Sequence, residues 1–268
     1  MSSIDDLFKR LKSENRKALM PFLTAGDPDL ETSAAVLRKL HAAGADLCEV
    51  GIPYSDPIAD GPVIQASYQR ALESGFRLEH AMKLGADNAA AVGLPMVTMV
   101  SYSIIYRVGL AKYVDQAMKA GYAGAIVPDL LVEEAADLAA VCREKDFSLI
   151  QLVTPTTPRE RQIQIANSST GFLYYVSVTG ITGERNALPE DLTENVGWLR
   201  EQTDLPICIG FGISGPETAA KLAPVADGLI VGSAVVRRIS ESSDPGSASD
   251  SVAEFVKQLR TSIDQASV

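Results

Sequence analysis

The chain has 268 residues, 46% of which are hydrophobic, and its formal net charge is −10 at pH 7. That length and apolar content suit one large α/β domain. The negative charge disfavours binding to nucleic acid or to an anionic membrane surface, and no apolar run reaches the roughly 18 residues of a membrane-spanning helix.

The N-terminal segment 1–17 is charged and helical in pattern, and it lacks the apolar core of a signal peptide. The three cysteines, Cys48, Cys142 and Cys208, stand far apart and do not have the spacing of a metal site. We therefore expect them to be reduced core residues of a cytoplasmic protein.

Short β-branched runs alternate with helical patterns along most of the chain. The runs predict eight strands, at 18–24, 46–50, 96–101, 123–127, 148–153, 172–176, 206–210 and 228–231. Helical patterns between them include 29–43, 132–144 and 191–201. This alternation fits a single (β/α)₈ TIM-barrel domain over residues 1–268, with a short N-terminal helix. A doubly wound open sheet is the structural alternative.

Two segments interrupt the alternation. Residues 177–190 form a connection longer than the roughly two to six residues usual between a strand and a helix, and such connections are often lids. Residues 240–251 are rich in Ser, Asp and Gly, and they predict a mobile surface loop before a last helix at 252–265. We assign this loop no function.

Glu49 stands at the end of the second predicted strand, where an unpaired charge is costly to bury. Because side chains alternate along a strand, Glu49 would point into the barrel mouth if Cys48 and Val50 face the helices. Active sites of this fold lie at that end of the strands. Apolar surroundings raise the pKa of a carboxyl group, which suits proton transfer near neutral pH. The alternative is a structural ion pair or a strand end turned to water.

Asp60 lies on the loop that follows, and it is either a second functional carboxylate or a turn residue, because Asp-Gly-Pro favours turns. Asp129, after the fourth strand, is expected to cap the helix that follows it. The two histidines, His41 and His80, lie in helical patterns, and no lysine lies in or at the end of a predicted strand. These positions disfavour a histidine triad, a metal cluster and a Schiff-base lysine.

Paired glycine turns follow the seventh and eighth predicted strands, at 210–212 and 232–233. Glycine lets backbone amides approach a ligand closely, and Ser233 would cap a short helix whose free amides favour an anion. This fold commonly binds phosphate there, so the pair predicts a phosphate site; the alternative is tight barrel corners. The residues thus indicate an enzyme that transfers protons on a small phosphorylated substrate.

Several motifs together resemble those of the tryptophan synthase alpha subunit family, in the family's order, from about Phe8 to Leu259. They are PFLTAGDP at 21–28, EVGIPYSDP at 49–57 with ADGP at 59–62, GITG at 180–183, and GFGI at 210–213 with GS at 232–233. The second motif is the most specific. The resemblance implies a lyase of L-tryptophan biosynthesis that cleaves indole-3-glycerol phosphate to indole and D-glyceraldehyde 3-phosphate by a retro-aldol reaction.

The resemblance also implies roles for individual residues. Glu49 would protonate the indole ring and remove the glycerol hydroxyl proton, and Asp60 would hold the indole N–H. Tyr174 would be the active-site tyrosine, and Thr182 would reach the aspartate from the lid. The phosphate contacts would be Gly183, Gly212, Gly232 and Ser233. The indole pocket would be lined by Phe22, Val100, Ile126, Leu152 and Phe211, each of which, taken singly, could equally be ordinary barrel core.

In the family, the alpha subunit needs no cofactor and pairs with a beta subunit that binds pyridoxal phosphate, so an alpha2beta2 tetramer is expected. Two loops that face the beta subunit depart from the family pattern, near Ile104 and at Leu131, where an Asn and a Pro are usual. A stand-alone indole-releasing lyase therefore stays open. A non-catalytic subunit that activates a beta partner is a further alternative, and the intact Glu49 and Asp60 speak against it.

Overall fold

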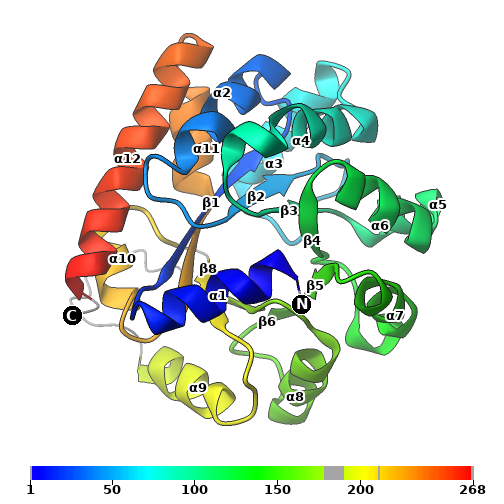
Figure 1. The fold of residues 1–268 in the computed structure, drawn as a ribbon, viewed down its shortest axis with the longest axis vertical. Coiled ribbons are helices and arrows are strands. Elements are labelled where there is room, and N and C mark those ends of the chain that lie inside the picture. Colours follow the sequence, from blue (N-terminus) through cyan, green and yellow to red (C-terminus); the bar gives the residue numbers. More distant parts are fainter. Residues whose placement is uncertain (1, 178–189, 211, 267–268) are drawn as a thin grey trace.

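The structure is a computed structural model that describes residues 2–177, 190–210 and 212–266 (Figure 1). A ring of parallel strands lies at its centre and helices surround it. The strands are β1 (Ala18–Thr24), β2 (Cys48–Gly51), β3 (Met96–Met99), β4 (Tyr122–Ile126), β5 (Ser148–Ile150), β6 (Leu152–Val153), β7 (Leu173–Val176), β8 (Ile207–Gly210) and β9 (Gly228–Val231).

The chain itself closes the ring. The strands pair in the order β5-β4-β3-β2-β1-β9-β8-β7-β6, so β5 and β6 are the two ends of the sheet. These two strands are halves of the single predicted strand 148–153, and only Gln151 separates them. The predicted (β/α)₈ barrel is therefore confirmed, and the open-sheet alternative is wrong.

Helix α1 precedes β1, and the other helices follow the strands around the outside. They are α1 (Ser3–Ser13), α2 (Leu30–Leu40), α3 (Pro62–Glu73), α4 (Leu78–Val92), α5 (Tyr102–Val108), α6 (Leu110–Lys119), η1 (Val132–Glu134), α7 (Ala136–Glu144), α8 (Arg159–Ser168), α9 (Glu190–Arg200), α10 (Pro216–Leu222), α11 (Ser233–Ser240) and α12 (Pro245–Ala266). Within the described part of the chain, no helix has the length and apolar character needed to cross a membrane.

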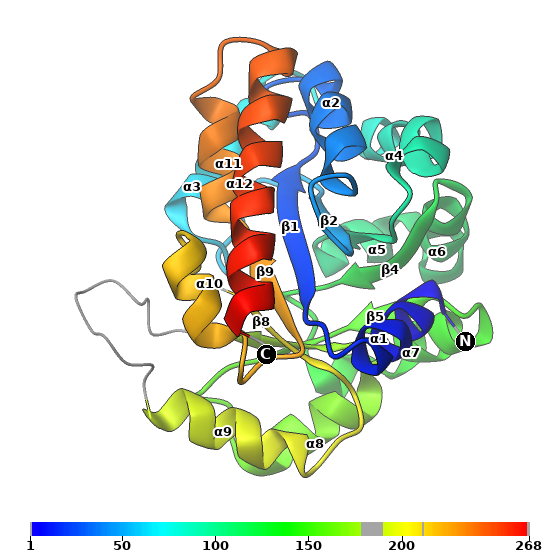
Figure 2. The same ribbon diagram turned by 60° about the vertical axis from the view of Figure 1, so that its left-hand side comes forward.

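The barrel has two apolar cores, and strand alternation separates them. The outer core lies between the strands and the helices and includes Cys48 and Val50. The inner core fills the barrel and includes Leu47. The apolar face of α1 belongs to the inner core, and Figure 2 shows this helix beside the N-terminal end of β1. Helix α1 therefore covers the N-terminal end of the barrel, and the candidate site lies at the other end, where the strands terminate.

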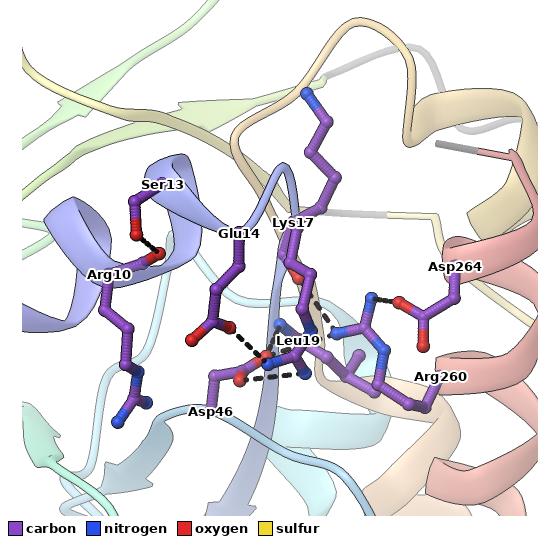
Figure 3. A network of polar contacts seen from close by, with 9 residues as sticks. Arg10, Ser13, Glu14, Lys17, Leu19, Asp46, Arg260 and Asp264 are labelled. Atoms are coloured by element: carbon purple, nitrogen blue, oxygen red, sulfur yellow. Dashed lines mark hydrogen bonds and ion pairs between the residues drawn. The ribbon is translucent and has the colours of Figure 1, made fainter. Parts of the chain in front are cut away.

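A polar network holds that lower end together (Figure 3). The buried carboxylate of Asp46 accepts hydrogen bonds from the Leu19 backbone N–H at 3.0 Å and from Arg260 Nη1 at 3.2 Å. Arg260 also donates to the Lys17 carbonyl at 2.8 Å and to Asp264. The network joins β1, the segment just before β2 and α12, so we assign it to stability.

Residues 245–251 are helical, so most of the predicted Ser-rich loop is wrong. Helix α12 begins at Pro245, and Asp244 and Ser247 cap it reciprocally. Asp244 Oδ1 accepts from the Ser247 N–H at 2.9 Å, and Ser247 Oγ accepts from the Asp244 N–H at 3.2 Å. Such a cap satisfies two free amides and offsets the low helix propensity of glycine and serine.

Candidate active site

Glu49 lies in β2 with its side chain inside the barrel. Its Cα is in register with Phe22 on β1 and Val97 on β3, and both of these residues belong to the inner core. Glu49 is 1% exposed, and among the described residues neither carboxyl oxygen has a hydrogen-bond partner. Burial raises the pKa of this carboxyl group well above its usual range. The predicted inward orientation is confirmed, and the catalytic role stays a prediction.

Asp60 lies on the loop between β2 and α3, where the predicted turn is confirmed and the functional role of its side chain stays a prediction. Its backbone forms a turn: the Asp60 N–H donates to the Pro57 carbonyl at 3.1 Å, and Gln65 Nε2 donates to the Asp60 carbonyl at 2.8 Å. Its side chain takes no part in that turn. Oδ2 is buried without a hydrogen-bond partner in the described structure, and burial raises the pKa of the carboxyl group to about 6.

Tyr174 faces the same interior from β7. Its register partners are Leu152 on β6 and Cys208 on β8, and all three contribute to the inner core. Burial raises the pKa of the phenol, and the negative charges of Glu49 and Asp60 raise it further. Tyr174 therefore keeps its proton and can act as a hydrogen-bond donor beside the two carboxyl groups.

Tyr68, which is absent from the predicted site residues, also reaches this site. It comes from α3, is 1% exposed, and its hydroxyl has no hydrogen-bond partner in the described ranges. A β-carbon built on Gly51 would lie 2.8 Å from that hydroxyl, and the Tyr54 ring packs on the Tyr68 ring with centroids 5.6 Å apart. Burial raises the pKa of the Tyr68 phenol, and the charge of Asp60 adds to the effect.

A sequence signal for Tyr68 exists in the spacing of α3. Ile64, Tyr68 and Ala71 recur at helical intervals after Pro62, which starts the helix. Such spacing puts the three side chains on one face, and the structure turns that face toward the barrel. The pattern could have identified Tyr68 as an inward residue, although ordinary core packing gives the same pattern.

The predicted pocket residues divide between the two cores. Phe22, Ile126 and Leu152 contribute to the inner core, as expected. Val100 belongs to the outer core, so its predicted place in the pocket is wrong. The inward side chain at the end of β3 is Met99, because alternation from Val97 turns every second residue to the interior.

Gly212, Gly232 and Ser233 lie near the ends of β8 and β9. Gly212 has φ +83°, a conformation that favours glycine. Helix α11 begins at Ser233, so Gly232 is the N-cap and the predicted capping role of Ser233 is wrong. The first amides of a helix have no partners within it, which leaves those of Ser233 and Ala234 for a ligand. A β-carbon on Gly232 would lie 3.8 Å from Phe22, so this turn adjoins the pocket.

Three predicted site residues, Thr182, Gly183 and Phe211, lie outside the described residues, as does 178–189 of the predicted lid. Their roles stay predictions.

Asp129 caps a different helix from the one expected. Its Oδ1 accepts from the Tyr102 backbone N–H at 2.8 Å, and its Oδ2 accepts from Ser101 Oγ at 2.7 Å. These contacts are at the start of α5, which follows β3. Because β3 and β4 are neighbours in the barrel, a residue after β4 reaches the helix that follows β3.

Large apolar side chains are exposed on three segments that follow strands. Ile58 is 89% exposed, Tyr106 72% and Leu131 54%. They lie on the loop of Asp60, on α5, and between β4 and η1. The three segments follow β2, β3 and β4, which are adjacent in the barrel, and exposed apolar groups of this size at one end of a barrel are consistent with an interaction surface.

The chemistry of the site depends on carboxyl and phenol groups. In the residues with assigned positions, no group of three or more His, Cys, Asp or Glu side chains is placed to hold a metal ion. Two carboxyl groups with raised pKa values at the mouth of a closed barrel, beside a phenol donor and a helix N-terminus, are the arrangement of a (β/α)₈-barrel enzyme.

Comparison with known proteins gives the family. The family model described as tryptophan synthase alpha chain matches residues 8–264. The tryptophan synthase alpha chain of Rhodopirellula baltica is 66% identical over 278 residues, which cover 99% of this chain and 100% of the relative. That of Prochlorococcus marinus is 44% identical, with 97% and 94% covered. The chain belongs to the tryptophan synthase alpha chain family.

Solved structures agree with this assignment. Tryptophan synthase subunit alpha from Legionella pneumophila superposes with a TM-score of 0.89 at 35% identity, covering 99% of each chain. A chain of Mycobacterium tuberculosis tryptophan synthase superposes with a TM-score of 0.89 at 32% identity, covering 98% of each. The predicted family, barrel fold and lyase class are confirmed.

Proposed function

We propose that this chain cleaves indole-3-glycerol phosphate to indole and D-glyceraldehyde 3-phosphate in the last stage of L-tryptophan biosynthesis. The observation that carries the proposal is the buried carboxyl group of Glu49 inside the barrel mouth, which has no hydrogen-bond partner among the residues that the structure describes. Family membership supports the choice of substrate. Burying an unpaired carboxyl group destabilises the fold, so its presence here calls for a functional reason.

Glu49 is the proton donor and acceptor of the proposed reaction. The carbon–carbon bond breaks with indole as the leaving group only after C3 of the ring is protonated. A carboxyl group with a raised pKa keeps its proton near neutral pH and can give it to C3. The resulting carboxylate removes the proton of the glycerol hydroxyl while the bonding electron pair returns to the ring. Glu49 thus ends the cycle protonated, as it began.

Asp60 has a different task because its surroundings differ. Its pKa of about 6 leaves most of the carboxyl group ionised at neutral pH. An ionised carboxylate accepts a hydrogen bond from the indole N–H and stabilises the positive charge that C3 protonation puts on the ring. Two carboxyl groups with separate pKa values therefore divide the acid–base and electrostatic roles. Tyr174 adds a protonated donor beside them.

The phosphate group is held at the opposite side of the mouth. The first amides of α11 and the turns at Gly212 and Gly232 favour an anion there. Gly183 and Ser233 complete the proposed set, and Thr182 and Phe211 are proposed to contact the substrate from the lid and the end of β8. Phosphate held there would orient the indole toward Glu49, beside Phe22.

A beta subunit that binds pyridoxal phosphate is the proposed partner, in a cytoplasmic alpha2beta2 complex, and this chain needs no cofactor of its own. The exposed side chains of Ile58, Tyr106 and Leu131 support such an interface, and relatives from Mycobacterium tuberculosis are tryptophan synthases. The unusual residues at Ile104 and Leu131 favour a second candidate, a stand-alone indole-releasing lyase.

The test is indole release from indole-3-glycerol phosphate by the purified chain, with and without its cognate beta subunit. Strong stimulation by the beta subunit supports the complex, and high activity of the chain alone supports the stand-alone lyase. Absence of turnover under both conditions overturns the proposed activity and leaves a non-catalytic, activating subunit.

A further inference from the structure

A groove of about 930 Å³ lies on the outer side of the barrel, between α4 on one side and α5 and α6 on the other. Figure 1 shows these three helices next to one another at the same side of the ring. The floor of the groove includes Ile52 and Pro53, the two residues that follow β2. The groove is therefore separate from the barrel interior, but it adjoins the segment that leads from Glu49 to Asp60.

The floor and walls of the groove are apolar. Ile52 and Phe76 are buried beneath it, with exposures of 1% and 8%. Partly buried apolar side chains extend this surface from α4 and α5: Leu78, Met82, Ile104 and Val108. A concave apolar surface of this volume falls within the range of small-molecule sites, which is roughly 300 to 1,000 Å³.

The rim is strongly basic. Five cationic side chains line the groove, against one carboxylate, Glu79. The cations are Arg77, Lys83, Arg107, Lys112 and Lys119. This concentration is unusual in a chain with a net charge of −10.

Most of these cations lack a partner within the described part of the chain. Lys83 forms an ion pair with Asp87 at 2.6 Å, next to it on α4. For the other four cations, the described structure contains no side-chain hydrogen bond or ion pair. Lys112 and Lys119 lie on one face of α6, with Gln116 between them. Like charges that face one groove without counter-ions repel one another, and a bound anion removes that repulsion.

We propose that this groove binds a small organic anion with an apolar body, such as a medium-chain carboxylate or phosphate ester. The apolar floor would cover the body, and the cations of α4, α5 and α6 would hold the charged head. An inorganic anion alone would leave the floor exposed, and a neutral apolar molecule would leave the cations unpaired. Nucleic acid and anionic membranes fit less well, because the rest of the surface carries the opposite charge balance.

Methionine methyl groups give a direct readout that does not depend on the lyase activity. The chain has six methionines, and Met82 lines the groove while Met20 lies in the inner core. In protein carrying isotope-labelled methionine methyl groups, titration with octanoate should shift the NMR signal of Met82 and leave that of Met20 in place. Octan-1-ol and inorganic phosphate should each bind at least about tenfold more weakly than octanoate.

Two double variants with the same charge change test the role of the cations. Lys112→Gln with Lys119→Gln removes two groove cations, whereas Lys221→Gln with Lys257→Gln removes two exposed lysines from α10 and α12, across the barrel (Figure 1). The groove variant should bind octanoate about tenfold more weakly, and the control variant should bind it as the parent does.

Three results would overturn the proposal. The first is an unshifted Met82 signal at saturating octanoate. The second is equal affinity for octanoate and octan-1-ol, which would show that charge plays no part. The third is equal weakening by the groove and control variants, which would assign the effect to net charge and not to this groove.

Discussion

The phenol ring of Tyr174 on β7 occupies the space that a β-carbon at position 210 on β8 would need. The hydroxyl and one edge of the ring both lie there, against the bare backbone of Gly210. The position of the phenol in the barrel mouth therefore depends on the absence of a side chain at residue 210.

Gly210→Ala should displace Tyr174 and lower kcat by about 100-fold, because small displacements of catalytic groups have effects of that size. Overpacking should also destabilise the barrel by about 1 to 3 kcal/mol. Steady-state kinetics and urea unfolding measure the two effects. Gly197→Ala is the matched control, because an added β-carbon meets nothing within 4 Å there. Unchanged kcat in Gly210→Ala would show that the phenol position does not matter for turnover.

Glu49→Gln should abolish turnover and leave substrate binding largely intact, since the amide keeps the shape but cannot exchange the proton. Turnover measured with the beta subunit present, and substrate affinity measured by calorimetry, separate these effects. Retained turnover would remove Glu49 from its assigned role.

The same variant should unfold at a higher temperature than the parent at about pH 8. Folding raises the pKa of Glu49. Its neutral form therefore contributes fully to the stability of the fold at a pH below the pKa of the unfolded state, and this contribution is lost as the pH rises through the pKa of the folded state. Glutamine stays neutral and avoids that loss. Thermal unfolding at about pH 4 should show a much smaller difference between the two proteins.

Asp60→Asn should show a pH dependence within a defined window. The pKa of this carboxyl group rises from 3.8 to about 6 on folding, so its stabilising contribution is lost between these values as the pH increases. At neutral pH the variant should be more stable than the parent by about 1 to 3 kcal/mol. Urea unfolding at a series of pH values measures this. A stability difference that does not change with pH would contradict the raised pKa.

Arg70→Ala should destabilise the chain by about 2 kcal/mol, because it leaves a buried carboxylate without its partner. Arg70 Nε and Nη2 donate to the two oxygens of Asp27 at 2.8 and 2.7 Å, and the Asp27 side chain is 2% exposed. Lysine cannot donate this pair of parallel hydrogen bonds, so Arg70→Lys should recover less than half of the lost stability. Urea unfolding measures both variants, with Lys83→Ala at an exposed pair as the control. Equal losses at the two sites would show that burial is unimportant.

Alternation along the strand made the inward orientation of Glu49 predictable. Cys48 and Val50 pack in the outer core, so the side chain between them points into the barrel. The family resemblance, and not this rule, assigns the pocket residue on β3 to Val100, and that assignment is wrong by one residue. A shift of one residue exchanges the two faces of a strand. In the run at 96–101 each face carries two apolar residues and one polar residue, Thr98 or Ser101, so the pattern does not fix which face is inward. Met99, not Val100, is therefore the inward residue.

Other differences come from contacts between segments that are distant in the sequence. Asp129 caps α5 because β3 and β4 are neighbours, and no local pattern carries that information. Tyr68 reaches the site through the packing of α3 over the end of β2. The start of α12 at Pro245 is marked in the sequence by its capping residues, Asp244 and Ser247. The composition of this first part of the helix nevertheless resembles that of a loop.

The ring closes at Gln151, between β5 and β6, and this residue separates the two halves of the barrel along the chain. A cut in the chain there would leave β5 paired with β4 and β6 paired with β7, so each fragment, 1–151 and 152–268, would keep its own strand ladders. The fragments would join along the β1–β9 ladder, where Ala18 to Pro21 pair with Gly228 to Val231. Both carboxyl groups belong to the first fragment, and the phosphate turns and Tyr174 belong to the second. Reassembly of two separately made halves would thus be the event that creates the active site.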